Sequence, residues 1–243
     1  MRPSISEFMN DQRKLCVARL GLVEYGAALR LQDAAVRARQ AGAMGDTLLI
    51  LEHPHVFTLG RGADAGFLRR QPDGIAIHRV SRGGQITYHG PGQLIGYPIL
   101  KLEGEACDVG HYLRNLEAVM IDALAQIGVA AGRREGMTGV WVGEKKLASI
   151  GVGLRRWVTF HGFALNVACD LSYFDAMVPC GIAGCEMTSI AALGGKEISV
   201  DSLAPLIAKS FAARFGYALA ETVSPGALWS LIDGAAAHCE ARS

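Results

Sequence analysis

The sequence predicts an α+β fold, with a mixed, mostly antiparallel β-sheet flanked by helices. Segments of helical spacing and segments of alternating polarity follow one another without a regular strand–helix–strand repeat, which a parallel sheet would need. The stretch 138–167 alternates and is punctuated by glycines, which is typical of antiparallel strands. No linker or internal repeat divides the 243 residues, so we expect one domain over 1–243.

The first half of the chain is expected to contain one helix and three strands. Residues 25–42 are rich in alanine and end in glycine, which predicts a helix. The apolar run 46–53 predicts a buried strand. Further strands are predicted at 74–80 and 92–100, on either side of a glycine-rich segment.

The second half is expected to add three helices and a hairpin region. Residues 109–128 carry apolar side chains at helical spacing. Two or three antiparallel strands are predicted within 138–167. The remaining helices are predicted at 201–215 and 226–238.

Composition excludes several classes of protein. Half of the residues are hydrophobic and 19% are charged, which is enough for a large core and argues against disorder. A net charge of +1 disfavours a nucleic-acid binder, and no apolar run approaches the ~20 residues of a membrane span. The polar N-terminus does not resemble a signal peptide, and six scattered cysteines form no CxxC pair. We therefore expect a cytoplasmic protein with reduced thiols.

One of these cysteines, Cys180, lies between Pro179 and Gly181 in "MVPCGIAG". Proline and glycine mark a turn, so the thiol is outside regular structure and is a candidate nucleophile. A free thiol has a pKa of ~8.5 and needs a nearby cation to become reactive. A histidine such as His89 or His161, or a lysine, could supply it, and spacing alone does not choose between them.

The segment 81–94, "SRGGQITYHGPGQL", contains four glycines among polar side chains. Glycines allow a ligand to approach the main chain closely, so we expect this segment to line a ligand site. It has the spacing of neither a P-loop nor a dinucleotide fingerprint. By contrast, the His53-Pro54-His55 motif favours a turn around the proline over a metal-binding pair.

A lysine pair begins the predicted strand in "GEKKLASIG", residues 143–151. Strand alternation would place Lys146 and Ala148 on one face, and Lys145 and Ser149 on the other. Only one of the two lysines can then point toward a site.

Four motifs together resemble the octanoyltransferases, the lipoyl(octanoyl) transferases of the lipoate-protein ligase B family. They are "RGGQITYHGPGQLIGYPI", "KLASIGV", "HGFALNV" and "VPCGI", in the order and at the spacing of that family. The resemblance covers about residues 46–215. It implies a single catalytic acyltransferase domain, similar to those of biotin and lipoate ligases.

The resemblance also implies roles for individual residues. Cys180 would be the nucleophile that becomes an acyl-thioester, and Lys146 would lower the pKa of its thiol. The acyl substrate would be lined by Arg82, Gly83, Gly84, Gln85, Ile86, Thr87, Tyr88, His89, Ser149, Ile150, Gly151, Gly162, Phe163 and Ala164.

The implied donor is octanoyl-acyl carrier protein. The implied acceptors are lysines on lipoyl domains, those of 2-oxoacid dehydrogenase E2 subunits and of the glycine cleavage H protein. No metal, nucleotide or redox cofactor, no nucleic acid and no membrane is implied, and we expect a monomer. The basic pair 155–156 is expected to guide docking of an acidic carrier protein. An ATP-dependent lipoate or biotin ligase, and an inactive acyl-binding module, are the alternatives.

Overall fold

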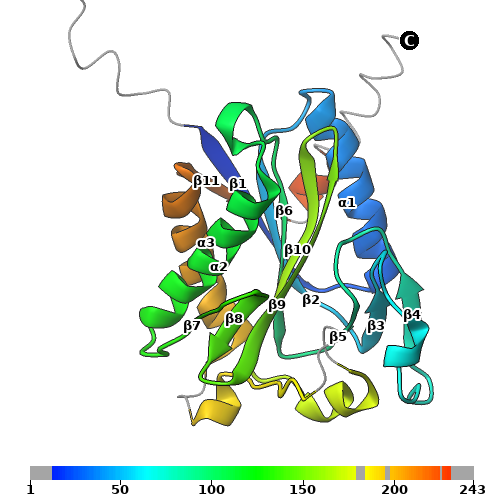
Figure 1. Ribbon diagram of the computed structural model, residues 1–243. Coiled ribbons are helices and arrows are strands. Elements are labelled where there is room, and N and C mark those ends of the chain that lie inside the picture. Colours follow the sequence, from blue (N-terminus) through cyan, green and yellow to red (C-terminus); the bar gives the residue numbers. More distant parts are fainter. Residues whose placement is uncertain (1–12, 179–183, 195–197, 225, 231–243) are drawn as a thin grey trace, which may run out of the picture.

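The computed structural model describes residues 13–178, 184–194, 198–224 and 226–230. Its centre is an eight-stranded sheet with the strand order β11-β1-β2-β6-β10-β9-β8-β7. In this sheet β1 is parallel to both of its neighbours, β11 and β2. The five remaining pairs, β2–β6, β6–β10, β10–β9, β9–β8 and β8–β7, are antiparallel. The prediction of a mixed, mostly antiparallel sheet with helices is confirmed (Figure 1).

The elements follow one another along the chain without a repeating unit. The strands of the large sheet are β1 (Lys14–Leu22), β2 (Thr47–Glu52), β6 (Gln93–Ile99), β7 (Gly132–Arg134), β8 (Met137–Val142), β9 (Lys145–Arg155), β10 (Val158–Asn166) and β11 (Ala218–Val223). A second, three-stranded sheet contains β3 (Val56–Leu59), β4 (Ala76–Arg79) and β5 (Ile86–His89). The helices are α1 (Tyr25–Gln40), α2 (Val109–Ala125) and α3 (Val200–Phe215).

Most of the expected elements are present. All three long helices form as predicted, and the stretch 138–167 contains β8, β9 and β10. Residues 226–230 are helical, and the rest of the helix predicted at 226–238 lies outside the described residues. The strands β1, β3, β7 and β11 were not predicted. Four of the fourteen residues of the glycine-rich segment also form a strand, β5, so the segment is not a loop throughout.

Helices cover both faces of the large sheet. Leu48 and Ile50 of β2 pack in the cluster that α2 and α3 form on one face. Leu49 and Leu51 point the other way and pack with α1. This period-two alternation explains why β2 is an unbroken apolar run: both of its faces are buried. Figure 1 shows α2 and α3 on one side of the sheet and α1 on the other.

The helices begin and end where their sequences provide caps. The Asp108 side chain accepts a hydrogen bond from the His111 N–H at the start of α2, and Ser199 forms a capping box with Ser202 at the start of α3. Gly216 ends α3 in a left-handed conformation that glycine adopts without strain. Within the described ranges, no helix has the length and apolar character needed to cross a membrane.

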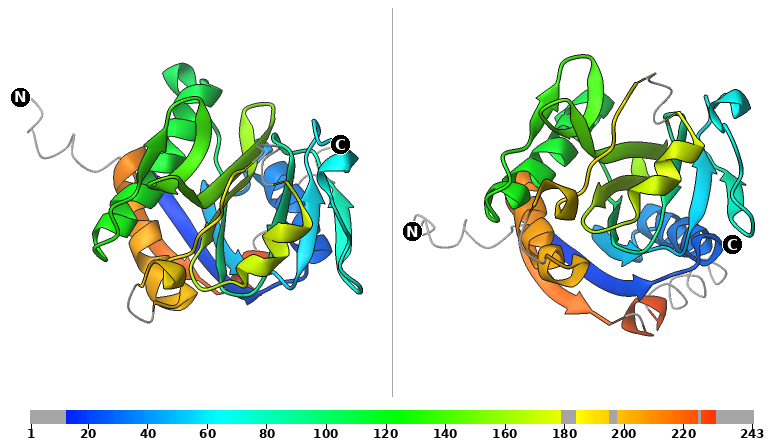
Figure 2. Two further views of the ribbon diagram at one scale, coloured as in Figure 1. Left: turned by 60° about the horizontal axis from the view of Figure 1, so that its bottom comes forward. Right: turned by 90° about the horizontal axis from the view of Figure 1, so that it is seen from below.

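The three-stranded sheet lies beside the large one, next to α1 (Figure 2). Tyr88 of β5 packs with Phe57 and Phe174 in a small apolar cluster of its own. The side chains that alternate with Tyr88, Thr87 and His89, line a cavity instead. This arrangement places the glycine-rich segment opposite β9 and β10.

Candidate active site

A cavity of about 220 Å³ opens between the two sheets. It draws residues from segments far apart in the sequence: the start of α1, the glycine-rich segment, the β7–β8 turn, β9 and β10. Its lining residues are Tyr25, Arg82, Gly84, Gln85, Ile86, Thr87, His89, Tyr97, Gly136, Met137, Thr138, Lys146, Ser149, Ile150, Gly151, His161, Gly162, Phe163 and Ala164.

The residues expected to line the acyl substrate meet at this cavity. All of them except Gly83 and Tyr88 are among its lining residues. The Gly83 N–H donates to the Val152 carbonyl at 2.8 Å, so that it ties the loop to β9. Tyr88 faces the opposite side of β5, where its hydroxyl lies 2.7 Å from His55 Nδ1.

Arg82 fixes the floor of the glycine-rich loop. Its Nη2 donates to the carbonyl and hydroxyl oxygens of Thr58 at 2.8 and 2.7 Å, and its Nη1 donates to the Gly83 carbonyl at 2.9 Å. A Cβ at Gly60 would lie 2.1 Å from the Gly84 carbonyl oxygen, and one at Gly151 would lie 3.0 Å from Arg82 Cδ. The strand and the loop can approach this closely because these positions are glycine.

Lys146 is buried in the same cavity, with 3% of its surface exposed. Its Nζ donates a hydrogen bond to the Thr138 carbonyl at 2.9 Å and lies 5.3 Å from the centre of the Trp141 ring. An ammonium held between a carbonyl oxygen and an aromatic face keeps favourable partners for its charge. The structure therefore places a fixed cation at one end of the cavity.

The strand that carries Lys146 does not follow simple alternation. Ala148 pairs with Val140, whereas Lys146 pairs with Trp141, so β9 contains one extra residue at this point. Ala148 packs in the core beneath α2, while Ser149 lines the cavity with Lys146. The expectation that Lys146 shares a face with Ala148, opposite Ser149, is wrong because the bulge reverses the alternation between them.

The neighbouring Lys145 points to solvent. Its side chain is 48% exposed and its Nζ lies 2.5 Å from Glu186 Oε1. An exposed pair of this kind contributes at most about 1 kcal/mol to stability. Of the two lysines, it is Lys146 whose ammonium lines the cavity.

The candidate nucleophile, Cys180, lies outside the described residues. The chain on either side of it is placed: the Val178 N–H donates to the Phe67 carbonyl at 2.8 Å. Beyond it, Met187 forms a parallel bridge with Lys146. The backbone of Lys146 accepts from the Thr188 N–H at 2.9 Å and donates to the Glu186 carbonyl at 2.8 Å. Residues 186–188, six to eight positions after Cys180 in the sequence, therefore run directly alongside the buried lysine.

Three histidines near the cavity are kept neutral by burial. Burial lowers the pKa of His53 to about 4 and that of His161 to about 3, and it lowers the pKa of His89 well below its ordinary value. His53 lies 2.6 Å from the Val23 carbonyl through Nδ1 and 2.8 Å from the Tyr97 hydroxyl through Nε2. At neutral pH these rings carry no charge, so they do not provide the cation that a thiolate needs.

Several cavity residues were missed by sequence reasoning. Tyr25 and residues 136–138 belong to segments in which no motif was recognised, and Tyr97 lies in a recognised motif but was not singled out. Burial raises the pKa of Tyr25 to about 12, against the opposing effect of the Arg82 guanidinium. A pattern of tyrosines in strand and helix positions predicts core packing equally well, so the signal was too weak to assign them.

Three of the other described cysteines, Cys16, Cys107 and Cys169, are partly or fully buried. Cys169 is buried in the small apolar cluster, and burial raises the pKa of its thiol to about 12. Burial also raises the pKa of Cys16. Cys107 packs beside the large core, and Cys239 lies outside the described residues.

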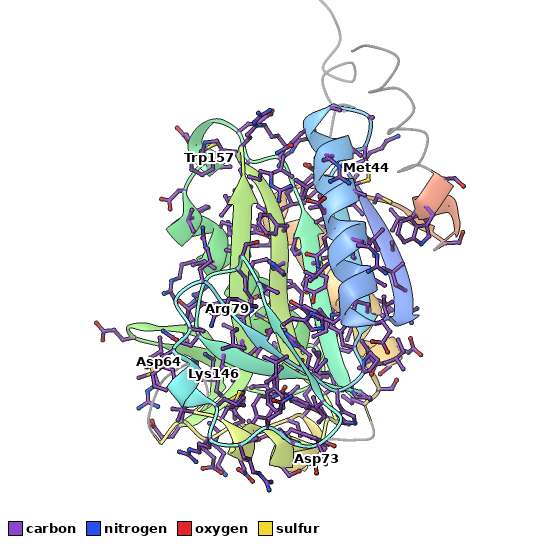
Figure 3. The ribbon with its side chains drawn as sticks, turned by 90° about the vertical axis from the view of Figure 1, so that its right-hand side faces the viewer. Met44, Asp64, Asp73, Arg79, Lys146 and Trp157 are labelled. Atoms are coloured by element: carbon purple, nitrogen blue, oxygen red, sulfur yellow. The ribbon has the colours of Figure 1, made fainter. Side chains whose placement is uncertain are left out.

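The basic pair 155–156 lies at the turn between β9 and β10. Figure 3 shows Trp157 of this turn at the end of the sheet remote from Lys146. Nine residues of strand separate Lys146 from Arg155, which corresponds to about 30 Å. Arg155 also pairs with Asp33 at 2.7 Å. This distance argues against the expectation that the pair guides a carrier protein to the site, which stays a prediction.

His53 and His55 point to different partners, Tyr97 and Tyr88. Over the part of the chain that the structure describes, no three His, Cys, Asp or Glu side chains are grouped so as to hold a metal ion.

Residues 24–212 match the model of the lipoyl protein ligase A/B catalytic domain. This match begins upstream of the region 46–215 that the motifs indicated. The chain is 49% identical to the octanoyltransferase of Solibacter usitatus over 210 residues, which cover 84% of this chain and 94% of that protein. It is 48% identical to the octanoyltransferase of Geobacter sulfurreducens over 203 residues, covering 83% and 85% of the two chains.

Solved structures show the same fold at low sequence identity. A lipoate-protein ligase A bound with ATP superposes with a TM-score of 0.67 at 16% identity, covering 92% of this chain and 93% of that one. The bi-partite lipoate protein ligase of Thermoplasma acidophilum gives a TM-score of 0.66 at 19% identity, covering 90% and 91%. The expected likeness to lipoate ligases is confirmed for the fold.

Proposed function

The chain belongs to the octanoyltransferases of the lipoyl protein ligase A/B catalytic domain family, and we propose that it transfers the acyl group through a covalent thioester on Cys180. The observation that carries this proposal is the placement of Lys146. Its ammonium is buried in a cavity lined by the expected acyl-binding residues, and its backbone pairs with the segment that follows Cys180.

The first step is an exchange of thioesters. The Cys180 thiolate attacks the acyl carbonyl of octanoyl-acyl carrier protein, a new C–S bond forms, and the carrier's phosphopantetheine thiolate leaves and takes up a proton. One thioester replaces another, so the step is nearly balanced in free energy. The Lys146 ammonium stabilises the attacking thiolate by its charge.

The second step forms an amide. The neutral ε-amine of a lysine on a lipoyl domain attacks the acyl-enzyme, the C–N bond forms, the C–S bond to Cys180 breaks and the amine loses its proton. An amide is more stable than a thioester, which drives the transfer forward. We propose lipoyl domains of 2-oxoacid dehydrogenase E2 subunits and of the glycine cleavage H protein as acceptors, and a monomeric cytoplasmic enzyme.

The cavity lining supports an acyl rather than a polar substrate. Ile150, Phe163 and Ala164 are apolar residues of the lining, and Gly151 and Gly162 let the acyl chain approach the strands. A Cβ at Gly162 of β10 would lie 2.1 Å from the Gly96 carbonyl oxygen of β6. The close packing of these two neighbouring strands therefore also requires glycine at this position. Burying each methylene of the substrate contributes about 0.8 kcal/mol to binding.

Intact-mass analysis after incubation with octanoyl-acyl carrier protein tests the proposal. The expected result is an enzyme carrying one octanoyl group, which hydroxylamine removes and Cys180→Ala abolishes. Neither octanoate nor ATP should be needed. An adduct that persists in Cys180→Ala, or transfer that requires ATP, would refute the acyl-enzyme on this cysteine.

A further inference from the structure

Helix α2 buries a carboxylate that the proposed reaction does not use. The side chain of Glu117 is 0% exposed. One of its oxygens, Oε2, accepts from Arg114 Nη1 at 2.6 Å and from Arg133 Nε at 2.9 Å. The other, Oε1, accepts a hydrogen bond from the Gly139 N–H at 2.9 Å.

The peptide that this second oxygen contacts is the one that holds Lys146. The Gly139 N–H and the Thr138 carbonyl belong to a single planar peptide unit, and they point in opposite directions from it. Glu117 Oε1 accepts from the N–H edge, and Lys146 Nζ donates to the carbonyl edge at 2.9 Å. A carboxylate, one peptide and an ammonium thus form a continuous chain of hydrogen bonds from α2 to the cavity.

Gly139 could not be another residue without displacing the lysine. Its φ is +134°, and a Cβ there would lie 2.6 Å from both Lys146 Cε and the Ala148 carbonyl oxygen. Because residue 139 has no side chain whose packing could orient the Thr138–Gly139 peptide, the orientation of this peptide depends on its hydrogen bonds. Glycine has more backbone freedom than any other residue, so an added acceptor restricts it most.

We propose that Glu117 is a positioning residue for catalysis: through the Thr138–Gly139 peptide it fixes the carbonyl that holds the Lys146 ammonium. This inference rests on the proposed function, in which that ammonium stabilises the Cys180 thiolate. A lysine side chain has many rotamers of similar energy, so a fixed acceptor is needed to keep its charge in one place. The negative charge of Glu117 strengthens the same chain of hydrogen bonds from its far end.

Two arginines, Arg114 and Arg133, pair with Glu117 and offset the hydration that its carboxylate loses on burial. A buried carboxylate loses several kcal/mol of hydration unless it is paired and hydrogen-bonded. Arg114 and Arg133 meet Oε2 from the solvent side, and their side chains are about half exposed. They neutralise the charge while leaving Oε1 for the peptide.

Two substitutions separate contact with the peptide from charge. Glu117→Asp keeps the charge and the arginines but withdraws the carboxylate by about 1.5 Å, so the oxygen no longer reaches the Gly139 N–H. Glu117→Gln removes the charge but keeps an oxygen within reach of the Gly139 N–H. Its amide nitrogen then faces Arg114 and Arg133, whose half-exposed side chains can turn to solvent, so it serves as the rescue variant. We expect kcat to fall on the order of 10²-fold in Glu117→Asp. In Glu117→Gln we expect only a few-fold loss.

The readouts are chosen so that a merely structural role would not move them. In Glu117→Asp the rate of iodoacetamide labelling of Cys180 should shift to higher pH, and KM for the octanoyl donor should stay the same. Asp122→Asn provides a matched control, because Asp122 is an arginine-paired acid on the same helix that does not line the cavity. Thermal melting of each variant reports on folding.

Two results would overturn the inference. The first is wild-type kcat and labelling in a folded Glu117→Asp variant. The second is the reverse order, with Gln impaired and Asp active, which would show that charge matters and contact with the peptide does not. If Glu117→Asp fails to fold, near-complete loss of labelling in the folded Gln variant refutes the role of the contact. If the wild type forms no octanoyl adduct, the proposed function fails, while the labelling rates still decide whether Glu117 places Lys146.

Discussion

Removing the Lys146 ammonium should convert a reactive thiol into an ordinary one. Lys146→Met keeps a long apolar stem in the cavity and deletes the charge. At a separation of about 4 Å and an effective dielectric constant of about 20, one positive charge stabilises a thiolate by about 4 kcal/mol. This energy corresponds to about three pKa units, so the variant's thiol should move toward the free value of ~8.5.

The consequence at neutral pH follows from that value. A thiol of pKa ~8.5 is about 3% thiolate at pH 7, so labelling of Cys180 should slow on the order of 30-fold if the wild-type thiol is fully ionised there. Acyl-enzyme formation should slow with it. The substitution also removes the donor to the Thr138 carbonyl and the charge over the Trp141 ring, and the unpaired carbonyl alone should cost about 1–3 kcal/mol of stability.

The adjacent lysine is the matched control. Lys145→Met breaks an exposed pair with Glu186 and leaves the cavity untouched. Iodoacetamide labelling rates measured from pH 5 to 10, with the modified peptide identified by mass spectrometry, compare the two variants with the wild type. A shifted profile in Lys145→Met, or an unshifted one in Lys146→Met, would refute the assignment of the cation.

Three further outcomes are expected. Cys185→Ser should retain octanoyl transfer, measured by acceptor mass, whereas loss of the adduct in a folded variant would mean that Cys180 is not sufficient. The backbone N–H groups of the exposed pair 69–70 donate to the Ala176 carbonyl, a few residues before Cys180 in the sequence. Reversing the charge of this pair should raise KM for the acidic carrier substrate a few-fold, whereas reversal at 155–156 should not. Ile150→Trp should shorten the cavity, so that the ratio of kcat/KM for octanoyl to kcat/KM for hexanoyl donors falls on the order of tenfold. This magnitude follows from a loss of about 0.8 kcal/mol of binding for each methylene excluded. An unchanged ratio would place the end of the acyl chain elsewhere.

Local patterns were enough to predict the elements that carry strong local signals. The alanine-rich stretch of α1 and the helical spacing of α2 depend on neighbours three and four residues away, and both helices formed. The glycines of segment 81–94 indicated that a ligand would approach the main chain there, and Gly84 of this segment lines the cavity. Gly60 and Gly151 show that the protein's own strands also approach this segment closely. These features depend on side-chain size and period, which a sequence displays directly.

Other features depend on partners far away in the chain. The strand β1 is defined by its parallel neighbours β2 and β11, which no local pattern in Lys14–Leu22 reveals. Tyr25 and Tyr97 reach the cavity from α1 and β6 only because the two sheets meet there. The buried acid Glu117 occupies an otherwise apolar face of α2, and its arginine and peptide partners lie on the β7–β8 hairpin as well as on its own helix.

The bulge in β9 shows why a strand pattern alone misplaced the neighbours of Lys146. In an unbroken strand Lys146 would share the face of Ala148, which packs in the core beneath α2. One extra residue turns the lysine to the cavity face, together with Ser149. The same bulge lies across from the β8 residues that follow the Thr138–Gly139 peptide, so the turned lysine meets a carbonyl that α2 already holds through Glu117. The cation is therefore positioned by an irregularity of the sheet and a carboxylate oxygen on a helix, and a defect in either one should be detected first in the reactivity of Cys180.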